Sequence, residues 1–263
     1  SEMCIRDSQI YTASFMRNWN YIIELNDSSA IVIDPLSDEL INDFLDKNSL
    51  TLKTIINTHE HFDHIQGNQA LIDQHGCDVW SHKNCVGKVP GLSRILKTGE
   101  IINLDLDSQI KVLDTPGHTF AHLSLLLLVK NTQFAIIAGD ALFNAGVGNC
   151  RNGGDPETLY QTISQQFCVL HDDVIVYPGH EYLENNLKFT LSIEPDNSDA
   201  SDWLLNLQEQ DPIIGSRHIT IGDERKINTF MRLDSPTIRS NLDLVDASDK
   251  DVFVSLRMRR DSW

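Results

Sequence analysis

The sequence has few cysteines and no pair of them spaced for a disulfide framework or a zinc ribbon. Its five cysteines are scattered, with no C-x-x-C pair among Cys4, Cys77, Cys85, Cys150 and Cys168. An odd number of widely spread cysteines is typical of a reducing compartment. We therefore expect free thiols rather than disulfide bonds.

Long apolar runs are also lacking. The longest nearly unbroken run, residues 123–129, is far shorter than the ~20 residues that a membrane helix needs. No charged segment followed by an apolar one opens the sequence, so we expect no secretory signal. These absences predict a cytoplasmic protein with no membrane partner.

Positive charge is scarce. The 263 residues contain 21 Lys and Arg against 38 Asp and Glu, a formal net charge of −17. Because nucleic-acid binding depends on basic residues that neutralise phosphates, we expect no nucleic-acid partner. The charge is uneven: residues 213–263 hold nine basic and eight acidic residues, so the first 212 hold 12 and 30. An anionic ligand is therefore best tolerated by the C-terminal part.

The hydrophobic share of 41% is ordinary for a globular protein, and the length suggests one to two domains. Alternating apolar residues and turn signals predict strands in the first 180 residues. These are residues 21–25 and 30–33 as a hairpin, 52–57, 78–80, 110–113, 123–129 and 134–138 as a second hairpin, and 174–177.

Capping residues predict helices between these strands. Ser37 opens one helix, residues 68–75 form another that ends at Gly76, and Asp155-Pro156 opens a third that runs to about Val169. From Glu181 onward helical patterns dominate, with breaks at Glu194-Pro195 and Asp211-Pro212. We place a domain boundary near residue 180, which divides the chain into residues 1–180 and 181–263.

The most informative string is T-H-E-H-F-D-H, which directly follows the strand predicted at residues 52–57. It offers His59, His61, Asp63 and His64, three imidazoles and a carboxylate that zinc and iron accept as ligands. Taken alone, the string could also be a solvated polar turn with incidental histidines. Three further residues favour the metal site, because each follows an apolar strand and a glycine: His118, Asp140 and His180.

In this order, H-x-H-x-D-H followed by His, Asp and His resembles the binuclear hydrolase pattern of the metallo-β-lactamase superfamily. The resemblance implies an α/β fold, a four-layer αββα sandwich with the metal site at one edge of its two sheets. It implies that His59, His61 and His118 bind one ion, that Asp63, His64 and His180 bind the other, and that Asp140 bridges them. Other branches fit less well, because the lactamases have Cys at the position of Asp140.

Within the superfamily, the stretch P-G-H-E-Y at residues 178–182 and the ending L-R-M-R-R-D at residues 256–261 resemble glyoxalase II, the hydroxyacylglutathione hydrolases. The resemblance implies a C-terminal helical domain and glutathione contacts from Tyr182, Arg257 and Arg260. The glycine-rich loop after Asp140 departs from the family, because Asn149 stands where a base is expected and Arg151 stands near the expected aromatic residue. Both are kept as candidate substrate contacts.

This resemblance predicts hydrolysis of S-acylglutathione thioesters of the S-lactoylglutathione type by a metal-bound hydroxide. Two divalent ions lower the pKa of a shared water to roughly 7, so no activated Ser or Cys is needed. Zinc is the expected metal, with iron or manganese as alternatives. Asp63 is expected both to bind metal and to orient the nucleophile. Asp34, Thr58 and Thr119 are candidates to hold the ligating histidines from behind.

Other interpretations stay open at this stage. A persulfide dioxygenase of similar fold would use one iron on the equivalents of His59, His118 and Asp140. A lactonase or promiscuous esterase is favoured if the altered loop has abolished glutathione recognition, and a binding module without activity is the fourth possibility. Arg257, Arg259 and Arg260 could simply form a solvated helix face. Cys150 could be a redox-sensitive thiol or a small filler. We expect a monomer or a weak homo-oligomer.

Overall fold

The computed structural model describes residues 6–12, 15–208 and 218–263. These residues belong to two compact units, each assembled from several segments of the chain. The sheet unit comprises Ser1–Asp114, Ala121–Gly139 and Gly179–Glu181, and the helical unit comprises Thr115–Phe120, Asp140–Pro178 and Tyr182–Trp263. The division predicted at residue 180 is a division along the sequence, whereas the helical unit also includes residues 115–120 and 140–178, which precede it.

The sheet unit contains a six-stranded mixed sheet in the order β1-β2-β3-β4-β5-β6. Its strands are β1 (Arg6–Thr12), β2 (Asn18–Glu24), β3 (Ser29–Ile33), β4 (Thr51–Ile56), β5 (Asp78–His82) and β6 (Leu92–Leu96). The first three strands pair antiparallel and the last four pair parallel. Since Ile33 is paired with Ile56, the residues that follow β3 and β4 emerge side by side at one edge of the sheet.

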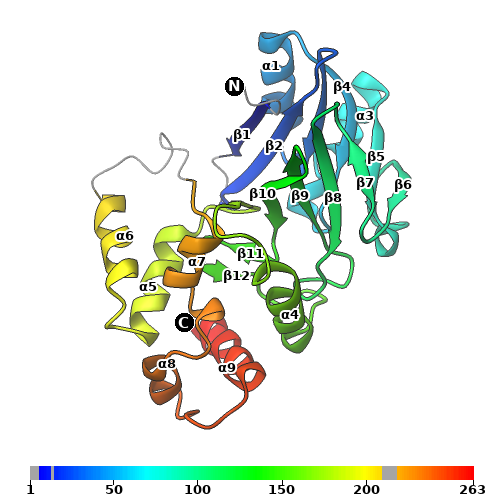
Figure 1. The fold of residues 1–263 in the computed structure, drawn as a ribbon. Helices are drawn as coiled ribbons and strands as arrows, with labels where there is room; N and C mark the ends of the chain where they lie inside the picture. The colour runs from blue at the N-terminus through cyan, green and yellow to red at the C-terminus, as the bar shows by residue number, and fades with distance from the viewer. Residues whose placement is uncertain (1–5, 13–14, 209–217) are drawn as a thin grey trace. The chain divides into compact units, whose positions relative to one another are not determined.

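The predicted first hairpin is confirmed by β2 and β3, and the second by β9 (Leu123–Val129) and β10 (Thr132–Gly139). Together with β7 (Ile101–Asn103) and β8 (Ser108–Asp114), these last two strands form an antiparallel order β10-β9-β8-β7 within the sheet unit. Figure 1 shows these green strands lying in front of the blue strands of the first sheet. Every residue of β3 is buried, as expected of a strand covered on both faces.

Helices cover the other face of the first sheet. They are α1 (Asp38–Asn48) and α3 (Asn68–His75), with the short α2 (Phe62–Ile65) between β4 and α3. The predicted capping is confirmed, because the Ser37 hydroxyl accepts a hydrogen bond from the Leu40 N–H and Gly76 ends α3 at a φ of 63°. Ile41, Leu45 and Leu71 of these helices share a buried cluster with the apolar side chains of β2 to β5.

The first helix of the helical unit is α4 (Pro156–Thr162), which Asp155 caps as predicted and which continues as a π-helical turn over Ile163–Phe167. Its short strands are β11 (Leu142–Phe143), β12 (Gly146–Val147) and β13 (Ile175–Pro178). The remaining helices are α5 (Leu183–Ile193), α6 (Ser198–Gln208), α7 (Ile221–Ile227), α8 (Pro236–Asn241) and α9 (Asp249–Ser262). A 3-10 turn over Thr229–Met231 lies between α7 and α8.

The predicted helical character after Glu181 is confirmed, and the break at Glu194-Pro195 falls between α5 and α6. The break predicted at Asp211-Pro212 lies outside the described residues. A small core holds α5, α6 and α7 together. Its buried members are Ala145, Leu183, Leu187, Ala200, Ile219 and Ile227.

Strand β1 was not predicted, since its residues alternate weakly and contain three charged or amide side chains. The described cysteines Cys77, Cys85, Cys150 and Cys168 are free thiols as predicted, and Cys4 lies outside the described residues. None of the helices within the described ranges combines the length and the apolar character that a bilayer crossing requires.

Candidate active site

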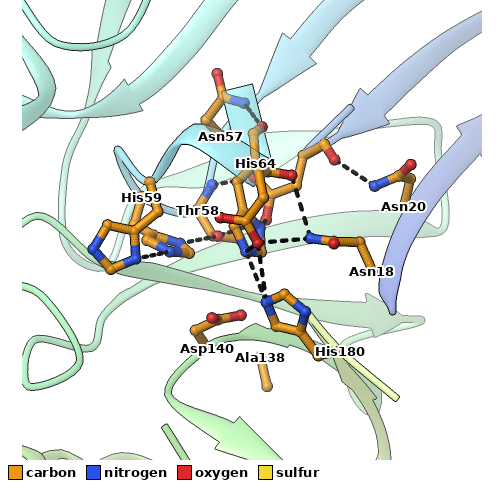
Figure 2. Close-up of polar contacts among 12 residues, drawn as sticks. Asn18, Asn20, Asn57, Thr58, His59, His64, Ala138, Asp140 and His180 are labelled. Carbon is orange, nitrogen blue, oxygen red and sulfur yellow. Dashed lines mark hydrogen bonds and ion pairs between the residues drawn. The ribbon is translucent and has the colours of Figure 1, made fainter. Parts of the chain in front are cut away.

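The edge of the sheet unit at the ends of β3 and β4 carries the T-H-E-H-F-D-H segment. Asp34, directly after β3, accepts hydrogen bonds from the N–H of Thr58 at 2.7 Å and from its hydroxyl at 2.6 Å. The same carboxylate lies 2.9 Å from Nδ1 of His64. Asn57, which ends the strand, donates its amide to the carbonyl of His64 at 2.7 Å (Figure 2). The loop is therefore fixed at both of its ends by buried side chains.

Four of the predicted metal ligands lie in this segment, and their donor atoms converge in two groups. Nε2 of His59 lies 3.1 Å from Nδ1 of His61. Nε2 of His64 lies 3.4 Å from Oδ2 of Asp63. His180, far along the chain, completes the second group, and its Nε2 lies 3.3 Å from Oδ2 of Asp63 and 3.3 Å from Nε2 of His64. Figure 2 shows the His64 and His180 rings turned toward one another.

These distances fit ligation of a metal ion. A tetrahedral ion that holds nitrogen and oxygen ligands at about 2.1 Å separates its ligand atoms by roughly 3.4 Å. The three donor atoms of Asp63, His64 and His180 have this mutual spacing and form one of the ligand groups of the chain. If the two facing imidazole nitrogens each carry a lone pair and no proton, they cannot hydrogen-bond to one another. A cation bound between them explains why they lie so close together.

Three of the candidate ligand rings, those of His59, His64 and His180, have a hydrogen-bond partner at the outward nitrogen. Nδ1 of His180 donates to the carbonyl of Met16 at 2.6 Å, and Nδ1 of His64 faces the Asp34 carboxylate. Nδ1 of His59 lies 2.9 Å from the Thr58 hydroxyl. Such partners fix the tautomer and direct the Nε2 lone pair toward the metal. Asp34 and Thr58 thus lie where the sequence analysis placed them.

The other two predicted ligands lie in the helical unit. Nε2 of His118 lies 3.4 Å from Oδ2 of Asp140, again the separation of two ligands of one ion. Nδ1 of His118 donates to the carbonyl of Asn149 at 2.6 Å. Gly117 precedes the histidine at a φ of 141°, and a Cβ there would lie 2.4 Å from Cα of Leu159, so only glycine fits.

Sequence reasoning missed Asn18, which is fully buried at the start of β2. Its amide donates to Oδ2 of Asp63 at 2.9 Å and to the Asp63 carbonyl at 3.3 Å. Its backbone forms a β-bridge with His180. Asn20, two residues on and on the same face of the strand, donates to the carbonyl of Asp34 at 2.6 Å (Figure 2). Two asparagines on one face of a strand that also contains Trp19, Ile22 and Ile23 were the available signal, since buried amides need partners.

The helical unit contains a cavity of about 440 Å³ lined by all five predicted substrate residues. They are Asn149, Arg151, Tyr182, Arg257 and Arg260. The sequence analysis did not single out the other lining residues, which are Phe143, Val147, Asn152, Asn186, Asp261 and Trp263. Three guanidinium groups and one carboxylate give this cavity a net positive charge.

The three arginines of the cavity have different surroundings. Arg257 is 4% exposed, and its Nη1 donates to the carbonyls of Val147 at 2.9 Å and Gly148 at 3.1 Å. Arg260 is partly exposed, donates to Asn186 Oδ1 at 3.3 Å and lies 5.2 Å from the centre of the Trp263 ring. Arg257 is thus mainly a support of the cavity wall, whereas Arg260 presents its charge to the cavity.

Asp261 binds two of these guanidinium groups. Its Oδ1 accepts from Nη2 of Arg257 at 2.9 Å, and its Oδ2 lies 3.4 Å from Nε of the exposed Arg151. Burial raises the pKa of the Cys150 thiol in the same loop to about 12. A thiol that stays protonated is a poor nucleophile and a poor redox sensor, which favours the filler role for Cys150.

Comparison with known proteins agrees with this geometry. Residues 15–180 match the family model described as metallo-beta-lactamase superfamily, and residues 181–263 match hydroxyacylglutathione hydrolase C-terminus. A hydroxyacylglutathione hydrolase of Polaromonas sp. is 40% identical over 97% of this chain and 98% of its own length. One from Nitrosococcus oceani is 42% identical, with the same coverage.

Solved structures share the fold at lower identity. The crystal structure of ETHE1 from Myxococcus xanthus aligns with a TM-score of 0.66 and 21% identity over 97% of both chains. A metallo-beta-lactamase from Staphylococcus aureus aligns with a TM-score of 0.65 and 18% identity, covering 98% of this chain and 72% of its own. The predicted α/β metallo-β-lactamase sandwich with a C-terminal helical part is confirmed.

Proposed function

Because the chain belongs to the metallo-β-lactamase superfamily and, within it, to the hydroxyacylglutathione hydrolase family, we propose that it is a metal-dependent hydrolase of S-acylglutathione thioesters. The observation that carries the proposal is the 40% and 42% identity to two such hydrolases over 97% of the chain. The donor-atom spacing in the sheet unit and the positively charged cavity in the helical unit each support it independently.

We assign seven ligands to two divalent ions. They are His59, His61 and His118 for one ion, Asp63, His64 and His180 for the other, and Asp140 as the bridge. The support is the ligand-like spacing within each unit and the matching donor chemistry of imidazole and carboxylate. When bound, two such ions make water a strong nucleophile at neutral pH and withdraw electron density from the scissile carbonyl.

Asp63 is the residue to which we assign a catalytic role. Among the described residues, its contacts to His64, His180 and Asn18 all use Oδ2 or the backbone. Oδ1 can therefore accept a hydrogen bond from the attacking water and orient it. The thiol of the leaving group has a pKa near 8.5, so it departs as a thiolate without a general acid. The proposed mechanism therefore requires no proton donor for the leaving group.

The cavity of the helical unit is proposed to bind the glutathione portion. S-acylglutathione carries two carboxylates and one ammonium group, and the cavity offers three guanidiniums and one carboxylate, Asp261. Arg151 brings to the loop the positive charge that the family has at the position of Asn149. The departure noted in the sequence is in this way compensated within the same cavity. Tyr182 and Asn149 supply further polar lining.

Several finer statements belong to the same proposal. We propose zinc as the metal, with iron or manganese as alternatives, because a mixed His and Asp site accepts all three. We propose a cytoplasmic monomer or weak homo-oligomer that binds no nucleic acid, in keeping with its charge of −17. We also propose that residues 1–180 supply most of the metal ligands and residues 181–263 most of the substrate contacts.

The test compares turnover of S-D-lactoylglutathione, a simple acyl lactone and glutathione persulfide, with metal content measured on the same sample. We expect two metal ions per chain and the highest kcat/KM on the thioester. One iron per chain with oxygen consumption on the persulfide would overturn the proposal in favour of a dioxygenase. Lactone turnover without thioester turnover would establish an esterase that does not recognise glutathione.

A further inference from the structure

Glu224 of α7 is a buried carboxyl group that the proposed mechanism does not use. Its side chain is 0% exposed. Both of its oxygens accept from the backbone N–H of Ala145, at 3.0 and 3.1 Å. Asn228 donates its amide to Oε2 at 2.7 Å. A carboxyl group buried in this way needs a reason, because burial without a compensating role costs stability.

The backbone that Glu224 holds is a turn in an uncommon conformation. Ala145 has a φ of 57°, in the left-handed region that residues with a Cβ seldom occupy. The residues on either side of Ala145 are each held by an asparagine side chain. The Asn228 amide also donates to the carbonyl of Gly146 at 3.2 Å, and the Asn186 amide donates to the carbonyl of Asn144 at 2.9 Å. A strained turn that is held by several hydrogen bonds is typical of a functional site.

The loop that leaves this turn leads to a metal ligand. Arg257 holds the carbonyls of Val147 and Gly148, and the next carbonyl, that of Asn149, accepts the Nδ1 proton of His118 at 2.6 Å. The loop has little room to move. A Cβ on Gly148 would lie 1.9 Å from the Asp140 carbonyl oxygen and 2.9 Å from Nδ1 of His118.

We propose that Glu224 is a positioning residue of the active site: it holds the turn at residues 144–146 and thereby fixes the loop that orients His118 and lines the substrate cavity. The inference rests on the proposed function for the meaning of that loop. The links lie within the helical unit: hydrogen bonds join α7 to the turn, the backbone continues from the turn through the loop at residues 147–149, and the Asn149 carbonyl accepts from the outward nitrogen of His118. Displacing the turn turns the His118 ring and weakens its hold on a metal ion.

The chain offers a matched control for this role. Glu194 is also buried, at 3% exposed, and accepts hydrogen bonds from Arg232 at 2.8 Å and Ser235 at 2.6 Å. None of its described partners lies in the loop at residues 144–149. Glu194→Ala should therefore lower stability, as Glu224→Ala also should, but it should leave His118 in place.

The experiment titrates each full-length variant with Zn²⁺ in competition with a chromophoric chelator and measures the unfolding free energy in denaturant. We expect Glu224→Ala, which removes both acceptors of the Ala145 N–H, to lower the affinity for one of the two Zn²⁺ ions by about tenfold, as loss of a partner behind a metal ligand does. We expect Glu194→Ala to bind both ions as the wild type does. Equal Zn²⁺ affinities in the two variants would overturn the positioning role.

A second variant keeps the test decisive if Glu224→Ala does not fold. Asn228→Ala removes the amide that contacts both Glu224 and Gly146, so it should weaken one Zn²⁺ site in the same direction, and unchanged affinity would contradict the proposal. Thioester turnover of the wild type is measured separately. A wild type that binds Zn²⁺ but does not hydrolyse the thioester refutes the proposed function, whereas an active wild type with unaffected variants refutes only the role of Glu224.

Discussion

Asn18 shows how a single amide can set the geometry of a proposed metal ligand. Its side chain donates to Oδ2 of Asp63, the oxygen that faces His64 and His180. A hydrogen-bond donor of this kind orients the carboxylate, and it occupies an oxygen to which a proton would otherwise bind. The role of Asn18 could not be predicted from the local motif, because it comes from a strand 45 residues before Asp63.

Replacing Asn18 with alanine should weaken the metal site of Asp63 without unfolding the protein. We expect a loss of about 10- to 100-fold in affinity for one ion, the usual effect of removing a hydrogen bond behind a ligand. Chelator competition measures this affinity. Asn197→Ala is the control, since this buried amide donates to the Lys226 carbonyl at 2.9 Å, away from the ligands. Equal affinities in the two variants would refute the role of Asn18.

Arg257 and Arg260 should respond differently to substitution, although the sequence analysis assigned both of them to substrate binding. Arg260→Ala should raise KM for the thioester by about 10- to 100-fold with little change in kcat, because a charged hydrogen bond to bound substrate is lost. Arg257→Ala should lower the unfolding free energy by about 2 kcal/mol, because two loop carbonyls lose their donor. Steady-state kinetics and denaturant titration separate the two effects.

The neighbouring Arg259 of α9 serves as the control for both. It is exposed and lines a different hollow from that of Arg257 and Arg260. Arg259→Ala should therefore keep the KM and the stability of the wild type. If it raised KM as much as Arg260→Ala, the effect would come from the general charge of the helix and not from the cavity.

At the scale of elements, the features that depend on residues close together in the sequence could be predicted. The helices opened by Ser37 and Asp155 and the stop at Gly76 were confirmed, because caps are local. The position of candidate ligands after strand ends could also be predicted, as Asp140 directly after β10 illustrates. The support of the glycine-rich loop by Arg257 could not, because it links residues 110 apart in the sequence.

The glycine-rich loop after Asp140 has no room for a larger side chain at Gly148. Gly148→Ala would place a Cβ 1.9 Å from the Asp140 carbonyl oxygen, so the loop must shift away from His118 and Asp140. We expect lower metal content and at least a tenfold loss of kcat/KM, measured by metal analysis and thioester turnover. Gly222→Ala is the matched control, because its Cβ would lie 3.1 Å from the Asp172 side chain, and it should behave as wild type.

At the scale of the whole molecule, the sequence indicated one boundary but the compact units draw on several segments each. Short stretches such as residues 115–120 and 179–181 belong to the unit opposite to that of their neighbours in sequence. Periodicity within a segment reports its secondary structure, whereas its tertiary partners depend on distant residues. The order of elements was therefore predictable, and their assignment to compact units was not.

The stability of the metal-free protein should depend on pH through Glu224. Burial raises its pKa from the ordinary 4.5 to about 8, and the charge of Asp223 adds to this. The folded protein then holds a proton that the unfolded chain has released. The unfolding free energy should therefore fall as pH rises from about 4.5 to about 8, by an amount on the order of a few kcal/mol.

Denaturant titrations of chelator-treated protein at pH 5, 6.5 and 8 measure this dependence, and the chelator removes the contribution of bound metal. Glu224→Gln carries no titrating group at this position, so its stability should change less over the same range. A variant with the full pH slope of the wild type would show that other groups are responsible.

The pairing of His64 with His180 has a consequence for the unfolded chain. Their Nε2 atoms lie 3.3 Å apart across 116 positions of sequence. An ion held by both would act as a cross-link, which restricts the conformational entropy of a long loop as a disulfide does. For a loop of this length a permanent link contributes about 5 kcal/mol in the chain-entropy model. A protein with free thiols and no disulfide among its described cysteines would thus gain a reversible staple, one that closes when metal is available and opens when metal is withdrawn.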